Sequence, residues 1–268
     1  MHSARLPAFV LLFGSVLLAA QPDPRELVRQ SVRNGESAWR QSLEYFCVEN
    51  DLDREFNPEG AVRSVSDDVY DLIPLGYGDF YQQHIRHDNE PLAREDMARG
   101  EAELAKLRHL SPAEKQRQFH KLVTERAYML EVPDAFNYTI VGTDNLPSGP
   151  AWILEAVPRP GYVPLSRYAH MFHAMRGKLW IDQKDLQWVK AEAVATEDVS
   201  FGFFIARLSK GSRITIEQMR LPDGQWVPKR IEARAAARTF LFFNHNFEEQ
   251  VTYSDYRKSS APMVTAQR

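Results

Sequence analysis

The chain has 268 residues, of which 44% are hydrophobic and 26% charged, and its formal net charge is -3. This length and hydrophobic content suffice for one large β domain or two ordinary domains, each with a substantial core. Nucleic acid is excluded as a partner class, because phosphate binding needs clustered basic residues and these are interspersed with acids.

The N-terminus predicts an export signal. An apolar block at 6–18 follows Arg5, and the small pair Ala19-Ala20 precedes a rise in polarity at Gln21. These are the parts of a secretory signal, and the block is short for a membrane span; an uncleaved anchor is the alternative. We expect cleavage after Ala20. Gln21 stands where a lipoprotein would carry a lipid-accepting Cys, so the chain cannot be lipidated there. The mature chain is then periplasmic or secreted, not an integral membrane protein, and loss of Arg5 changes its net charge from -3 to -4.

A helix is predicted over residues 25–40, where Val28, Val32 and Trp39 share one face. Gly35 should weaken it by about 1 kcal/mol relative to alanine. Strand-like runs follow at 43–49, 61–72 and 79–87. They read as strands with a charged outer face and a thinner apolar inner face. The single cysteine, Cys47, excludes an internal disulfide and is interpreted as a buried apolar residue rather than a nucleophile.

A helical insertion is predicted at about 90–131, where Ala, Glu, Lys, Arg and Leu replace β-branched residues. Ser111 and Glu114 form a capping box with Pro at the first helical position, so we expect helices at 92–107 and 112–130. Their wide charged faces favour a surface insertion, and a mobile cover over a cavity is the functional alternative.

Strand patterns return after Pro133 and continue to the end of the chain, with turn residues between the runs. About eleven antiparallel strands result in all, and a twisted sheet that wide curls. The predicted fold class is α+β, mostly antiparallel β: an unclosed half-barrel with an N-terminal helix and the two-helix insertion covering the concave face. We expect one domain over 21–260 and a flexible tail at 261–268. The later runs are 136–141, 151–157, 177–182, 186–195, 201–208, 212–221, 225–235 and 239–256.

Catalytic and metal-binding signals are weak. His84 and His87 lie in a strand-like run, where residues three apart point to opposite faces, and His170 and His173 have no acidic third ligand nearby. Asp67 and Asp68 read as a solvated strand edge, and no nucleophile elbow, P-loop or dinucleotide-binding pattern occurs. We therefore expect no enzyme activity, no cofactor and no metal.

Aromatic residues concentrate in the C-terminal strands. They are interpreted either as the packed core of the sheet or as the wall of a cavity that holds an acyl chain or other apolar ligand. The candidate ligand-binding residues are Trp152, Trp180, Trp188, Phe201, Phe203, Trp226, Phe240 and Phe242.

Four short motifs carry a family resemblance: Gly-Lys-Leu-Trp-Ile-Asp at 177–182, Lys-Gly-Ser at 210–212, Asp-Gly-Gln-Trp-Val-Pro at 223–228 and Tyr-Ser-Asp-Tyr-Arg-Lys at 253–258. These motifs make the C-terminal half similar to uncharacterised exported bacterial proteins. With the export signal, one amphipathic helix, about eleven antiparallel strands and the helical insertion, the chain resembles the LolA/LolB-like superfamily of periplasmic lipoprotein carriers.

The resemblance implies an unclosed barrel whose apolar cavity shelters lipid-like groups or, in related sensor domains, binds protein segments. The first functional hypothesis is a non-enzymatic periplasmic protein that binds the acyl chain of a lipid or lipoprotein. The alternative is a protein-interaction or envelope-sensor module with a filled core and an envelope protein as partner. A hydrolase or metal enzyme is the third.

Overall fold

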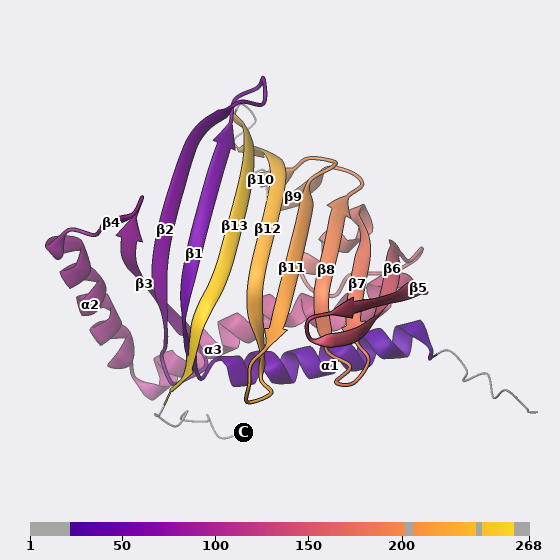
Figure 1. The fold of residues 1–268 in the computed structure, drawn as a ribbon, viewed down its shortest axis with the longest axis horizontal. Helices are drawn as coiled ribbons and strands as arrows, with labels where there is room; N and C mark the ends of the chain where they lie inside the picture. Colours follow the sequence, from indigo (N-terminus) through magenta and orange to yellow (C-terminus); the bar gives the residue numbers. More distant parts are fainter. Residues whose placement is uncertain (1–21, 202–205, 240–242, 260–268) are drawn as a thin grey trace, which may run out of the picture.

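A single antiparallel sheet dominates the computed structural model, which describes residues 22–201, 206–239 and 243–259 (Figure 1). Its main path runs β4-β3-β2-β1-β13-β12-β11-β8-β7-β6-β5 and stays open between β4 and β5. The expected unclosed sheet of about eleven strands is confirmed. The strands of this path are β1 (Tyr45–Phe56), β2 (Val62–Pro74), β3 (Phe80–His87), β4 (Glu90–Pro91), β5 (Phe136–Leu146), β6 (Gly149–Pro158), β7 (Met175–Asp182), β8 (Trp188–Ala195), β11 (Arg213–Arg220), β12 (Trp226–Thr239) and β13 (Phe243–Lys258).

The run predicted as one strand at 201–208 differs from expectation. It contributes to two short strands, β9 (Val199–Phe201) and β10 (Ala206–Leu208), which lie off the main path. These two strands lie off the main path because β12 is longer than β11. Strand β12 pairs with β11 only up to Arg234 and continues to Thr239. Strand β10 pairs with this extension, so β8 pairs directly with β11.

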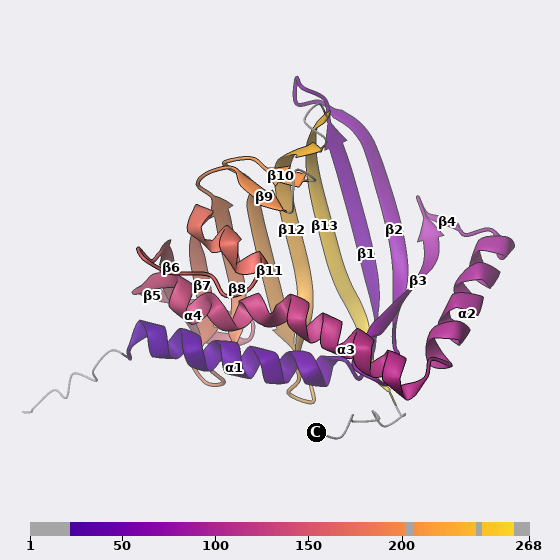
Figure 2. The same cartoon turned by 180° about the vertical axis from the view of Figure 1, so that it is seen from behind.

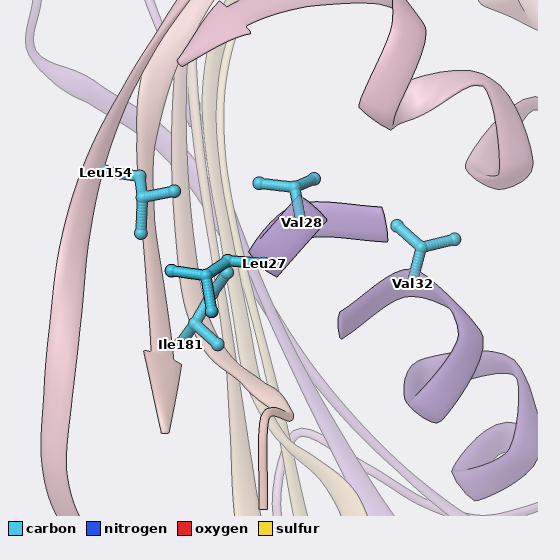
Figure 3. Packing of buried hydrophobic residues seen from close by; sticks show 5 residues of the cluster. All are labelled: Leu27, Val28, Val32, Leu154 and Ile181. Carbon is cyan, nitrogen blue, oxygen red and sulfur yellow. The ribbon is translucent and has the colours of Figure 1, made fainter. Parts of the chain in front are cut away.

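Helix α1 (Pro24–Ser42) crosses the concave face of the sheet (Figure 2). It begins where the Asp23 side chain accepts a hydrogen bond from the backbone N–H of Arg25, 3.0 Å away. Leu27, Val28 and Val32 are buried, and this part of the helix packs on Leu154 of β6 and Ile181 of β7 (Figure 3). These five side chains form the core beneath the first half of α1.

Gly35 has a structural reason to stand inside α1, which continues through it. A Cβ atom at this position would stand 2.8 Å from Nε1 of Trp188. The close approach of the helix to β8 therefore requires glycine, and the helix keeps it despite its cost in helix propensity, about 1 kcal/mol.

The predicted insertion contains α2 (Arg94–Arg108) and α3 (Pro112–Arg126), followed by η1 (Ala127–Glu131) and α4 (Val132–Ala135). The capping box of Ser111 and Glu114 is present at the start of α3. Figure 2 shows α3 and the turns after it lying beside α1 over the concave face, whereas α2 flanks β3. The predicted cover is thus formed mainly by α1 and α3.

A second core cluster lies beside η2 (Tyr168–Ala174), where Phe136 and Tyr162 pack with Phe172. The Glu131 side chain is buried next to it and accepts three hydrogen bonds: from the Tyr162 hydroxyl at 2.6 Å, and from the backbone N–H groups of Leu165 and Ser166 at 2.8 Å each. One carboxylate thereby orders the loop between β6 and η2.

Among the described residues, no helix is both long and apolar enough to cross a membrane. The predicted signal at 1–20 and the predicted tail at 261–268 lie outside the described residues.

Candidate functional site

One row of paired residues shows how the concave face changes in character across the sheet. Residues that pair across neighbouring strands point to the same face, so the row can be followed from strand to strand. It runs from the polar pair His87 and Asp68 to Asp51 and then to Val251, and it continues through Ile231, Ile216, Ala191 and Leu179 to Leu154. The face is polar near β3 and apolar near β6.

An apolar pocket of about 270 Å³ lies in the middle of this row, beneath the second half of α1. We call it the central pocket. Its wall combines the helix, the residues after α3 and strands β8, β11 and β12. The apolar lining includes Val32, Trp39, Trp188, Ile216, Trp226 and Ile231.

The side of the central pocket between α1 and α3 is bridged by charged groups. The Arg126 guanidinium lies 3.0 Å from a carboxylate oxygen of Glu36 and 4.2 Å from the centre of the Trp39 ring. A partly exposed ion pair and a cation–π contact each contribute only about 1 kcal/mol or less. This bridge positions the end of α3 against α1. Breaking it to separate the two helices costs little free energy.

The base of the central pocket is held by polar contacts from two turns. The indole N–H of Trp226 donates to Asp185 at 3.1 Å, and the Gln225 side chain donates to the carbonyl of Ala38 on α1 at 2.8 Å. Trp226 therefore has its polar edge satisfied while its ring faces the pocket.

Only some of the predicted ligand-binding aromatics meet here. Trp188 and Trp226 line the central pocket, and Trp152 packs against the neighbouring core of Leu154 and Ile181.

Trp180 lies on the opposite face, because it alternates with Leu179 and Ile181, which both belong to the core under α1. There its N–H donates to Asp144 at 3.2 Å, and the Lys190 ammonium lies 4.7 Å from its ring centre. Phe203, Phe240 and Phe242 lie outside the described residues, as does the side chain of Phe201.

A patch of carboxylates on the concave face was not predicted from the sequence. Asp51 and Asp53 of β1 and Glu249 of β13 bring carboxylate oxygens within 4.8 Å of one another. Burial, reinforced by Asp53, Glu249, Glu49 and Asp68, raises the pKa of Asp51 to about 6. Charged residues of β1 were expected on the outer face of the sheet, but these carboxylates lie on its inner, concave face.

Cys47 lies buried on the same face of β1. Burial raises the pKa of its thiol to about 12, which keeps it protonated at neutral pH. Its surroundings agree with the expected packing role rather than with nucleophilic chemistry.

The two histidine pairs differ from each other in the structure. His170 and His173 lie on η2 and join no cluster of three metal-ligating groups in the described part of the chain. His84 and His87 were expected on opposite faces of β3, and this expectation is wrong. A bulge in the pairing with β2 places both beside Asp68, with all three ligand atoms within 4.8 Å.

The sequence matches no protein-family model and no curated protein. Solved structures similar to the chain include a DUF1329 family protein from Desulfovibrio piger, at 13% identity and a TM-score of 0.32, covering 90% of this chain and 95% of that one. A putative outer membrane lipoprotein-sorting protein domain from Vibrio parahaemolyticus has 10% identity and a TM-score of 0.31, with coverages of 87% and 94%.

A third similar structure is MucB in complex with MucA(peri), at 10% identity and a TM-score of 0.24, covering 89% of this chain and all of that one. At these identities and scores, the function rests on the chain's own residues.

Proposed function

We propose that this protein is a non-enzymatic exported carrier that binds the acyl chain of a lipid or lipoprotein in the central pocket. The observation that carries the proposal is the pocket itself: an apolar space on the concave face, lined by Trp39, Trp188 and Trp226 and covered by α1, the end of α3 and η1. Each sheltered methylene contributes about 0.8 kcal/mol, so burial alone supplies the affinity.

The central pocket is too small to hold a long acyl chain unless its cover moves. Its volume of about 270 Å³ lies just below the common range for small-molecule pockets, roughly 300–1,000 Å³. A long chain therefore needs the end of α3 and η1 to move away from α1. The partly exposed Glu36–Arg126 bridge opposes that movement only weakly, which supports the interpretation of the insertion as a mobile cover.

A second candidate is a protein-interaction or envelope-sensor module with a filled core and an envelope protein as its partner. It is favoured by the filled space under the first half of α1, where Leu27 and Val28 pack on Leu154 and Ile181. In this alternative, the small central pocket is a packing gap, and the exposed charged helices contact the partner.

The test is native mass spectrometry of protein recovered from its export compartment, followed by calorimetric titration of the delipidated protein with a long-chain fatty acid. The carrier proposal expects a co-purifying lipid mass and saturable binding. Ile216→Trp should abolish binding by filling the pocket. Ile214→Trp is the matched control, because Ile214 lies on the same face of β11 but does not line the pocket.

The outcomes separate the two candidates. A ligand-free protein that also fails to bind fatty acid would refute the carrier proposal. A stoichiometric protein partner, crosslinked in cells and retained by Ile216→Trp, would instead support the interaction module.

A further inference from the structure

We infer that Asp68, His84 and His87 form a binding site for one divalent transition-metal ion, with Zn²⁺ as the best fit. Oδ1 of Asp68 lies 2.7 Å from Nε2 of His84 and 2.8 Å from Nδ1 of His87. Three ligand atoms of the kinds that zinc prefers therefore converge from two adjacent strands. We call this group the Asp-His-His triad.

The convergence depends on a bulge in β3. Asp68 pairs with His87 and Val69 with Arg86, but Tyr70 pairs with His84, so that Ile85 has no partner on β2. The extra residue shifts the alternation of side chains by one position. His84 and His87 consequently point to the same face, and the bulge shapes the triad.

Neighbouring groups orient two of the three ligands. The Ser66 hydroxyl donates to the second carboxylate oxygen of Asp68 at 2.7 Å. The Tyr70 ring stacks on the His84 imidazole, with ring centres 4.7 Å apart and planes 26° from parallel. Such outer contacts are the kind that fix ligand direction in metal sites.

The geometry suits a zinc ion with one open position. Zinc bonds of about 2.0–2.2 Å in a tetrahedron place ligand atoms about 3.3 Å apart. Oδ1 of Asp68 therefore needs to separate from each imidazole nitrogen by only about half an ångström, and the two imidazole nitrogens already lie within 4.8 Å of each other. His84 also lies with Nε2 2.9 Å from the Arg86 carbonyl oxygen. Metal binding replaces that contact, with the His84 proton carried on Nδ1.

The surrounding charge favours a cation. Asp51 pairs with Asp68 across β1 and β2, and it belongs to the carboxylate patch with Asp53 and Glu249. A metal ion at the triad would add positive charge beside this patch and would link β2 to β3 near the edge of the sheet.

The test uses the tag-free mature chain, stripped with a chelator and dialysed, and titrates it with Zn²⁺ by calorimetry and with Co²⁺ by visible absorption. We expect one equivalent of Zn²⁺ to bind and Co²⁺ to give the absorption bands of a low-coordinate nitrogen and oxygen site. His84→Gln with His87→Gln should remove both signals, and Ser66→Ala should weaken Zn²⁺ binding by roughly 10–100-fold.

The matched control is His170→Gln with His173→Gln, a histidine pair of the same spacing that joins no group of three metal-ligating side chains among the described residues. This variant should bind Zn²⁺ like the wild type. The inference is overturned if the wild type takes up no stoichiometric Zn²⁺, or if the His84/His87 variant keeps its affinity while its circular dichroism shows a folded chain.

Discussion

Replacing Glu131 tests whether one buried carboxylate orders the loop between β6 and η2. The side chain is only 9% exposed and accepts hydrogen bonds from Tyr162, Leu165 and Ser166. Burial alone would raise the pKa of Glu131, but the hydrogen bonds from Leu165, Ser166 and Tyr162 outweigh burial and hold its pKa below the ordinary 4.5. The folded state therefore favours the ionised form.

The expected loss for Glu131→Ala is about 3 kcal/mol of unfolding free energy. Hydrogen bonds to a charged acceptor contribute about 1.5–3 kcal/mol each, and the three are not additive. The Leu165 side chain is 89% exposed, so the backbone N–H groups of that loop can regain water, whereas the Tyr162 hydroxyl belongs to a residue only 7% exposed. Most of the loss comes from this hydroxyl and from the freed loop.

The assay is urea denaturation at pH 7.5, with Tyr162→Phe as the graded control. That variant removes one hydrogen bond to the charged acceptor and leaves the two backbone donors in place, so it should cost about 2 kcal/mol. A loss below about 1 kcal/mol for Glu131→Ala would refute the ordering role.

A second measurement uses pH. Because the folded-state pKa of Glu131 is lowered, its contribution is present above the unfolded pKa and is lost as pH falls through the folded pKa. The stability difference between wild type and Glu131→Gln should therefore shrink below about pH 4.5. A difference that stays constant from pH 7.5 to pH 3 would contradict the charge-based explanation.

Three further predictions concern other parts of the chain. Asp51→Asn should stabilise the fold by about 1 kcal/mol at pH 7.5. A carboxyl pKa raised from 3.8 to about 6 corresponds to roughly 3 kcal/mol, and access of water to the side chain reduces this value. The gain should appear as pH rises from 3.8 to about 6, and a pH-independent effect in urea titrations would contradict it. Gly177→Ala should lower the unfolding free energy by roughly 3 kcal/mol or more in thermal denaturation, because its Cβ would stand 1.9 Å from the Glu192 carbonyl oxygen. In the control Gly142→Ala, the added Cβ meets nothing within 4 Å, so this variant should be nearly neutral. Intact mass of the exported protein should show a chain that starts at Gln21, and a retained residue 1–20 segment would refute signal cleavage.

Local signals in the sequence determined most of the secondary structure. The capping box at Ser111 and Glu114 and the apolar face of Val28 and Val32 depend on residues within a turn or two of each other, and both are present as predicted. Turn residues between short apolar runs likewise predicted an open antiparallel sheet, because chain reversals need Gly, Pro, Asp or Asn wherever they occur.

Tertiary structure alone decided which side chains meet. The single unpaired residue Ile85 turns His84 and His87 to one face, which regular alternation forbids. The length of β12 moves β9 and β10 off the main path. The carboxylate patch joins β1 to a strand almost 200 positions away in the chain, at Glu249. Register, bulges and long-range pairing depend on partners distant in sequence, and no local pattern specifies them.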